Sequence, residues 1–327
     1  MDLKQELKKR ANIFNKELER YMQNGDPQAL YDAARHLPMA GGKRLRPCIT
    51  MLACEAVSGN VKEVMPLAAS LEILHNFTLV HDDIMDKSRL RRNLPTVHVK
   101  FGEPTAIMAG DLLFAKSFEI MHDLSVDLSM FKVLDKCLIQ CIKEICEGQQ
   151  LDMEFEQRQN VVEKEYLEMI RRKTAVLFSF AAEGGAMVGG GPDEQTNALK
   201  DYGIFLGFAF QIWDDYLDMS SDEKTLGKDI GNDIRNGKKT LIAVHSLSNA
   251  TGNDKKLLEN FFGNRNASEE DVKNVFATFQ KTGSIEYAKC TALNYNTQAK
   301  KALDVLGNSE AKKILLELAD YVMKREK

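Results

Sequence analysis

The sequence predicts an all-α protein, and three observations support this prediction. Apolar residues recur at helical spacing through most of the chain. Alternation of apolar and polar residues, the pattern of a half-buried strand, is nearly absent. The seven prolines all fall before residue 193, where they punctuate the helical segments. We expect a large helix bundle formed by one domain over residues 1–327.

The helical segments follow one another without a low-complexity linker or a solenoid repeat. Their expected bounds are near 2–23, 27–36, 46–57, 62–87, 103–121, 127–156, 163–188, 194–219, 239–248, 254–262, 268–281, 283–304 and 308–325.

Composition narrows the possible partners. The 44 basic and 48 acidic side chains give a net charge of −4, whereas a nucleic-acid-binding domain is usually strongly basic. No nucleic-acid partner is therefore expected. No uncharged apolar stretch reaches about 18 residues, so no membrane span is expected either. The charged N-terminus lacks a signal-peptide core, and the six cysteines include no CxxC pair, which favours the reducing cytoplasm.

Two segments, 62–81 and 199–213, are apolar on nearly every face, which predicts buried central helices. Each is followed by an acidic cluster with the spacing DDxxD. Because residues four apart lie on one helix face, the outer carboxylates of each cluster should be neighbours. The clusters are Asp82, Asp83 and Asp86, and Asp214, Asp215 and Asp218.

Both clusters lie towards the C-terminal end of a helix, where the macrodipole disfavours negative charge. Folding does not explain acid at this position twice, but a bound cation does. If the two acidic helix faces were opposite each other, they would present six carboxylates to one cavity. So much unpaired negative charge among apolar neighbours is costly, so bound cations are implied. Oxygen ligands suit Mg²⁺, which takes one or two carboxylates and completes its shell with water and phosphate oxygens.

Basic residues cluster where a phosphate-bearing partner would need them. Gly41 and Gly42 precede Lys43 and Arg46 at an expected helix start, where a backbone can approach an anion. Further basic segments are 89–98, 171–174 and 227–240. Each alone is typical of a solvated face, but together with the acidic clusters they favour phosphate binding.

Other phosphate-handling sites fit less well. The glycine-rich segment 184–191 lacks the Gly-Lys-Ser/Thr signature of a nucleotide loop and a preceding strand. The His81-Asp82 pair is typical of metal-dependent phosphohydrolases, but that interpretation leaves the second cluster without a role. A serine-histidine-aspartate triad does not stand out, although sequence alone does not exclude one.

Seven motifs, in order along the chain, resemble those of the trans-isoprenyl diphosphate synthases, the polyprenyl synthetase family. They are GGKRLRP (41–47), LVHDDIMD (79–86), LRRNLPTVH (90–98), GDLL (110–113), RKTAVLF (172–178), FQIWDDYLD (210–218) and GKDIGNDIRNGKKT (227–240). The resemblance implies the isoprenoid synthase fold, an all-α bundle around a deep central cavity, in a homodimer. It also implies that Mg²⁺ bridges the acidic clusters to an allylic diphosphate.

The resemblance assigns roles to individual residues. All six aspartates would bind metal. The isopentenyl diphosphate grip would be Lys43, Arg46, His75 and Arg92. The allylic diphosphate would contact Arg91, Lys173 and Lys228, with Lys238 beside it. The oxygens of Thr174 and Gln211 would face a carbocation. Asn93 departs from the family, which usually has glycine there, but asparagine tolerates left-handed backbone.

These roles describe a prenyl transfer. The allylic carbon–oxygen bond breaks once metal and fixed cations neutralise the leaving diphosphate. The alkene of isopentenyl diphosphate attacks the cation, a proton leaves to the released diphosphate, and the apolar walls exclude water. A terpene cyclase would lack the isopentenyl diphosphate grip. A non-catalytic subunit would have lost an acidic cluster.

Phe77 is the expected chain-length residue. It precedes Asp82 by five positions and Asp86 by nine, or about 7–14 Å along a helix at ~1.5 Å per residue. Its ring could form the floor of the product cavity, while the small Thr78 adds no second block. One aromatic residue at this position resembles the archaeal-type short-chain geranylgeranyl diphosphate synthases. Two adjacent aromatic residues would favour farnesyl diphosphate as the main product, which stays an alternative, and plain core packing of Phe77 is the other.

Overall fold

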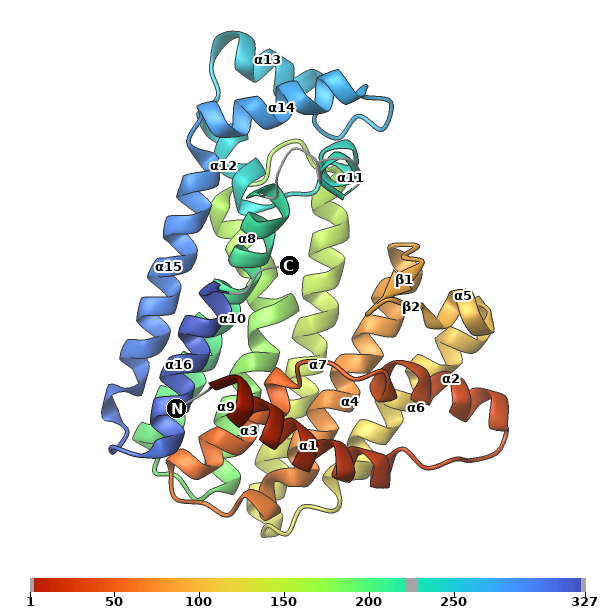
Figure 1. Cartoon of the computed structure of the whole chain (residues 1–327), viewed down its shortest axis with the longest axis vertical. Helices are drawn as coiled ribbons and strands as arrows, with labels where there is room; N and C mark the ends of the chain where they lie inside the picture. The colour runs from red at the N-terminus through yellow and green to blue at the C-terminus, as the bar shows by residue number, and fades with distance from the viewer. Residues whose placement is uncertain (1–2, 221–228, 325–327) are drawn as a thin grey trace. The chain divides into compact units, whose positions relative to one another are not determined.

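The computed structural model describes residues 3–220 and 229–324, and nearly all of them are helical, which confirms the prediction of an all-α protein (Figure 1). None of the helices in these residues combines the length and the apolar character that a membrane span needs.

The chain packs as two compact units, which we describe separately. Unit 1 comprises residues 1–137, 180–200 and 305–315. Its complete elements are α1 (Leu3–Tyr21), α2 (Gln28–Met39), α3 (Leu45–Ala56), α4 (Val61–Met85), β1 (Leu90–Arg91), β2 (Leu94–Pro95), α5 (Val97–Phe101) and α6 (Glu103–Met121).

Unit 2 comprises residues 138–179, 201–304 and 316–327. Its complete elements are α8 (Glu163–Ile170), the π-helical turn η1 (Arg171–Ala175), α11 (Asp229–Asn236), α12 (Leu241–Asn249), α13 (Gly252–Phe261), α14 (Glu269–Lys281) and α15 (Ser284–Ala302). Four helices contribute residues to both units, and a short 3₁₀ turn, η2 (Leu303–Val305), lies where the chain passes from unit 2 to unit 1. The four are α7 (Leu128–Gln157), α9 (Val176–Val188), α10 (Asp193–Ser220) and α16 (Glu310–Lys324).

The predicted buried helix at 62–81 is the centre of unit 1. The side chain of Asn60 caps the first turn of α4 by accepting from the amide of Lys62, and residues 64–74 are then buried without interruption. A helix buried all round has no polar face, as its sequence predicts. Burial becomes incomplete from His75 onwards, so the helix is no longer buried all round before its acidic end.

Only short elements within the described residues were absent from the prediction. They are α5, α11 and the hairpin β1–β2, in which Leu90 pairs with Pro95 and Arg91 with Leu94. The predicted segment 163–188 forms α8, η1 and α9, so its helical character is confirmed but its π turn was missed. The expectation of a single domain stays a prediction.

Candidate active site

The first acidic cluster ends α4, and its middle carboxylate is held by the protein. Asp83 is 1% exposed, and the guanidinium of Arg91 in β1 contacts both of its oxygens at 2.8–2.9 Å. Asp82 is half-buried and Asp86 is exposed. The more accessible pair is therefore the one spaced four residues apart, which shares a helix face.

A two-residue turn between β1 and β2 follows this cluster. Arg92 and Asn93 have φ values of 53° and 61°, so both are left-handed, as a type I′ hairpin turn requires. Asparagine tolerates this conformation, so Asn93 can stand where the family usually has glycine. The turn also directs Arg92 towards the end of α2 and the loop that follows it, where its guanidinium donates to the carbonyl oxygens of Leu37 and Gly41.

A basic cluster in unit 1, formed by Arg46, Arg91 and Arg92 around His75, includes three of the four residues predicted to hold isopentenyl diphosphate. Burial lowers the pKa of His75 well below its ordinary value, and Arg46, Arg92 and Arg91 lower it further. Burial also lowers the pKa of Arg92. Both effects favour the neutral imidazole, which has one N–H to donate among the guanidinium groups. The fourth residue, Lys43, is exposed.

Arg44 has a structural role that the sequence did not reveal. Its side chain is 2% exposed and its Nη1 lies 2.6 Å from the carboxylate of Glu72 on α4. The same guanidinium donates to the carbonyl of Pro38 and to Asn15. Arg44 thus ties the basic loop to α4. Only the buried carboxylate at Glu72, inside an otherwise apolar helix, could have signalled it.

Phe77 lies in an aromatic group at the edge of the unit 1 core. Its ring centroid is 4.9 Å from that of His81 and 5.4 Å from that of Phe114 on α6. Phe114 in turn contacts Phe118, with centroids 5.2 Å apart. The hydroxyl of Thr78 donates to the carbonyl of His75, so it is engaged with the helix backbone. The role of Phe77 and Thr78 in chain length stays a prediction.

In unit 2, the residues Lys173 and Thr174 lie on η1, where a π turn interrupts the helix. Such turns are frequent at functional sites. Close packing holds the turn: a Cβ on Gly148 of α7 would lie 2.4 Å from the amide nitrogen of Lys173. A Cβ on Gly207 of α10 would lie 2.4 Å from Cα of Ala175. Both glycines are therefore required where their helices cross η1.

A chain of hydrogen bonds joins η1, α10 and α8. Thr174 Oγ1 donates to Gln211 Oε1 at 2.9 Å, and Gln211 Nε2 donates to Asp215 Oδ1 at 3.2 Å. Tyr166 Oη donates to Asp215 Oδ2 at 2.8 Å. Beside this chain, Lys173 Nζ lies 2.5 Å from the carboxylate of Asp152 on α7. Tyr166 and Asp152 were not predicted.

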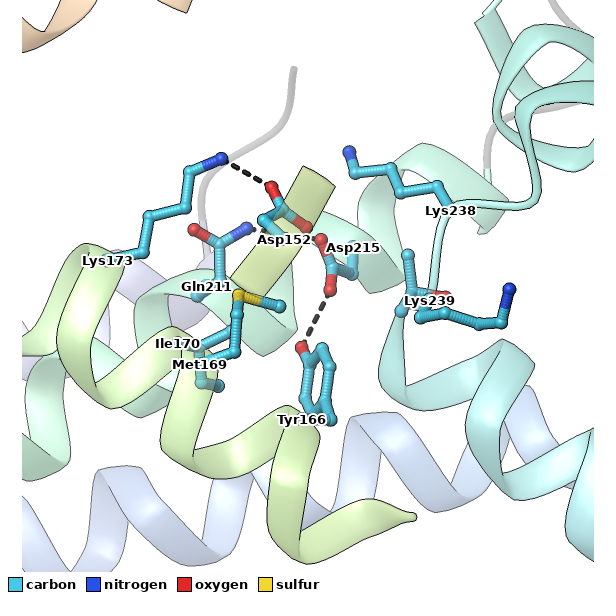
Figure 2. Close-up of a pocket in the computed structure, with 10 residues that line it drawn as sticks. Asp152, Tyr166, Met169, Ile170, Lys173, Gln211, Asp215, Lys238 and Lys239 are labelled. Carbon is cyan, nitrogen blue, oxygen red and sulfur yellow. Dashed lines mark hydrogen bonds and ion pairs between the residues drawn. The ribbon is translucent and has the colours of Figure 1, made fainter. Parts of the chain in front are cut away.

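All of these groups except Thr174 line a cavity of about 90 Å³ (Figure 2). Lys173 and Lys238 extend towards its carboxylates from opposite sides, whereas Lys239 points away. Burial disfavours the charge on Lys238, but Asp233, Asp215, Asp152 and Asp218 together raise its pKa. The full lining is Asp152, Tyr166, Met169, Ile170, Lys173, Gln211, Asp215, Lys238, Lys239 and Thr240. Lys228, the other predicted lysine, lies outside the described residues.

The middle carboxylate of the second cluster is also held by the protein. Burial raises the pKa of Asp215 to about 7, a rise that Lys238 and the hydrogen bonds from Tyr166 and Gln211 oppose. Asp214 and Asp218 are half-buried. As in the first cluster, the residues spaced four apart are the more accessible ones.

The acidic clusters fit a cation that needs few protein ligands. Among residues 3–220 and 229–324, no group of three or more acidic, histidine or cysteine side chains is arranged to hold a metal ion. Mg²⁺ is usually bound by one or two carboxylates, with water and substrate phosphate completing its shell. The accessible pair in each cluster suits that donor set. Whether all six aspartates are ligands stays a prediction.

Comparison with known proteins places the chain in a family. The family description for polyprenyl synthetase matches residues 27–279. The chain is 43% identical to the geranylgeranyl diphosphate synthase of Methanosarcina mazei, over 100% of this chain and 99% of that protein. It is 44% identical to the geranylgeranyl pyrophosphate synthase of Geoglobus acetivorans, over 98% of each.

Solved structures agree with this assignment. The geranylgeranyl pyrophosphate synthetase of Pyrococcus horikoshii superposes with a TM-score of 0.94 at 41% identity, over 99% of each chain. The decaprenyl diphosphate synthase of Rhodobacter capsulatus gives 0.90 at 34% identity, over 99% of this chain and 98% of that one. The predicted isoprenoid synthase fold is thereby confirmed. The chain belongs to the polyprenyl synthetase family and is a prenyltransferase.

Proposed function

We propose that this protein condenses isopentenyl diphosphate head-to-tail with an allylic diphosphate, in a Mg²⁺-dependent reaction that yields geranylgeranyl diphosphate. One observation carries the proposal: the unit 2 cavity brings the ammonium groups of Lys173 and Lys238, and the carbonyl oxygen of Gln211 to which Thr174 donates, close to Asp215 of the second acidic cluster. This combination suits the departure of a diphosphate and the positive charge that it leaves behind. The relatives named as geranylgeranyl diphosphate synthases support the product.

Lys173 and Lys238 would hold the allylic diphosphate. Their ammonium groups approach the cavity from opposite sides and are neutralised there by carboxylates before substrate binds. A bound diphosphate would replace some of these carboxylates as the partner of the two ammonium groups. Fixed cations stabilise the leaving group as its negative charge develops, which is where preorganised charge accelerates a reaction most. The resemblance to the family assigns Lys228 and Arg91 to the same diphosphate.

Thr174 and Gln211 would stabilise the allylic carbocation. Their oxygens lie 2.9 Å apart on η1 and α10 and are fixed by hydrogen bonds before substrate arrives. Neutral oxygens stabilise a cation without reacting with it as a carboxylate would. The apolar walls of Met169 and Ile170 would keep water away from the cation.

Mg²⁺ would be held by Asp82 and Asp86 in unit 1 and by Asp214 and Asp218 in unit 2, with Asp83 and Asp215 behind them. When bound, the metal supplies positive charge that stabilises the departing diphosphate. The protein's own part is to present carboxylates on one helix face at the end of an apolar helix.

The basic cluster of unit 1 would hold isopentenyl diphosphate. Arg46 and Arg92 supply charge, Lys43 adds an exposed cation, and the neutral His75 donates one N–H. Arginine suits this task because its planar guanidinium can bind phosphate through two parallel hydrogen bonds. The released diphosphate would accept the proton that ends the reaction, so no dedicated base is needed.

Phe77 would close the product cavity, with Phe114 supporting its ring from α6. A wall formed by one ring and a small neighbour fits a product of intermediate length. Two relatives, from Natronomonas pharaonis and Aeropyrum pernix, are named geranylfarnesyl diphosphate synthases, at 38% and 39% identity. Relatives at this level of identity are therefore named for products of different length.

A homodimer in the cytoplasm would be the working form. Ile107 and Met108 of α6 are 42% and 55% exposed, and large apolar side chains exposed together on one helix are typical of an interface. All six cysteines are free thiols, which suits a reducing compartment.

The proposal is tested by incubating the purified single chain with isopentenyl diphosphate and each allylic diphosphate, then separating the labelled products by chromatography. We expect geranylgeranyl diphosphate as the main product, lost in EDTA and restored by Mg²⁺. Turnover by the single chain would also distinguish it from a non-catalytic subunit. Absence of any condensation, or cyclic hydrocarbon products, would overturn the proposal.

A further inference from the structure

Tyr166 places a buried hydroxyl against the second acidic cluster from a separate helix. Its side chain is 1% exposed, and its Oη lies 2.8 Å from Asp215 Oδ2. Phenylalanine would fill nearly the same space without a polar atom that must find a partner. The hydroxyl therefore acts on Asp215 itself, and the roles proposed above do not include Tyr166.

Asp215 is held at both of its oxygens. Tyr166 occupies Oδ2, and Gln211 Nε2 donates to Oδ1 at 3.2 Å, the long end of the normal range. With only that long bond, the carboxylate plane would be free to rotate away from Gln211. The shorter bond from Tyr166 fixes the plane, and Oδ1 then stays in front of the Gln211 amide.

The carboxylate decides which way the Gln211 amide faces. Asp215 Oδ1 accepts from Gln211 Nε2, so the amide presents its NH₂ to Asp215. The carbonyl oxygen is thereby turned to the other side, where Thr174 Oγ1 donates to it at 2.9 Å. Thr174 takes one lone pair of that oxygen and leaves the second available. If the Gln211 amide were reversed, its NH₂ group would take the place of the carbonyl oxygen and would face a cation bound on that side.

We propose that Tyr166 is a positioning residue that, by fixing Asp215, holds the carbonyl oxygen of Gln211 towards the allylic carbocation. The inference rests on the proposed function, because it needs a cation beside Gln211. Tyr166 touches neither substrate nor metal in this role. Its effect reaches the reaction through two hydrogen bonds, at Asp215 and then at Gln211.

Two non-reacting ligands separate this role from general support of the fold. One is an ammonium analogue of the prenyl cation, bound together with inorganic diphosphate. The other is an uncharged thiolo analogue of the allylic diphosphate ester. Calorimetry with Mg²⁺ present should show that Tyr166→Phe weakens the ammonium analogue about tenfold, the value of one oriented hydrogen-bonding group. The thiolo analogue should bind within about twofold of the wild type.

Tyr287→Phe is the matched control. Tyr287 Oη also donates to a carboxylate in unit 2, that of Glu163 at 2.9 Å, but it does not line the cavity. This variant loses a comparable hydrogen bond and should leave the binding of both ligands unchanged. Circular dichroism of both variants checks that the helical fold is retained.

A double-mutant cycle provides the second test. Gln211→Leu alone should lose the preference for the ammonium analogue, and Tyr166→Phe should add nothing to that loss. Equal weakening of both ligands by Tyr166→Phe, no weakening of either, or a full effect in the Gln211→Leu background would overturn the inference. A wild type that does not prefer the ammonium analogue would instead count against the proposed function.

Discussion

The ammonium of Lys173 lies 2.5 Å from the carboxylate of Asp152, which comes from a different helix of the same unit. Both side chains are only about a quarter exposed, at 27% and 21%. Asp152 therefore fixes a long, flexible side chain at the wall of the cavity before any diphosphate is present. Lys173 then meets its substrate with little conformational freedom left to lose.

Replacing Asp152 should distinguish two effects: the orientation of Lys173, and the attraction of the site for a negatively charged diphosphate. In Asp152→Asn the lysine loses its anchor, but the site also loses a negative charge that repels an incoming diphosphate. We expect kcat to fall about tenfold, while KM for the allylic diphosphate does not rise. Steady-state kinetics measure both. Asp320→Asn breaks the more exposed Lys300 pair in the same unit and should change neither. An increase in KM with kcat unchanged would contradict this account.

The π turn that carries Lys173 should not tolerate a methyl group at Gly148. A Cβ there would lie 2.4 Å from the backbone of Lys173, and backbone does not move aside as a flexible side chain can. We expect Gly148→Ala to destabilise the protein by about 1–3 kcal/mol and to reduce turnover. Denaturant unfolding gives the free energy.

Gly307→Ala is the control for this prediction, since nothing lies within 4 Å of its added Cβ. It should leave stability and turnover nearly unchanged. If Gly148→Ala were as stable and active as this control, the close packing of α7 on η1 would not be what holds the turn.

The sequence predicted what depends on periodicity and spacing. The apolar run before Asp82 predicted a buried helix, and burial of residues 64–74 confirms it. Contacts between residues that are far apart in the sequence leave no such pattern in it. Tyr166 reaches Asp215 across 49 positions and Arg44 reaches Glu72 across 28, and neither separation is fixed by local geometry. The π turn was missed because it needs Gly148 and Gly207 from other helices.

The outer aspartates of each cluster should be indispensable. Asp82→Ala and Asp214→Ala remove a carboxylate from the accessible face, so turnover should fall by at least about a hundredfold. Circular dichroism should show an intact helical fold. Asp201→Ala, at an exposed position on the same helix as Asp214, should have no effect. Near-normal turnover of either cluster variant would rule out the proposed mechanism.

The contribution of Glu168 to stability should depend on pH. Hydrogen bonds from Arg171 and then Arg172 lower its pKa from 4.5 to about 2. As the pH falls, Glu168 therefore binds a proton in the unfolded chain before it does so in the folded protein. The stabilisation is present in full above about pH 4.5 and is lost as the pH drops towards 2. Because the side chain is 40% exposed, we expect less than about 1 kcal/mol.

Denaturant unfolding of wild type and Glu168→Gln measures this contribution. The difference between them should be largest at pH 7 and should shrink steadily below pH 4.5. Glu17, which pairs with the more exposed Arg20, offers the control variant Glu17→Gln. A difference for Glu168→Gln that stays constant from pH 7 to pH 2 would show that the hydrogen bonds, and not the charge, stabilise the fold.

Phe77→Ser should lengthen the product. The ring of Phe77 contacts Phe114 and His81, so serine would open space about one helical turn below the acidic cluster while leaving α4 intact. We expect products longer than geranylgeranyl diphosphate, measured by chromatography at equal substrate ratios. Thr78→Val keeps the size of the neighbouring residue and loses only a hydroxyl that bonds to the helix backbone, so its product should not change. If Phe77→Ser gave the wild-type products, Phe77 would be packing in the core, and the floor of the cavity would have to lie elsewhere.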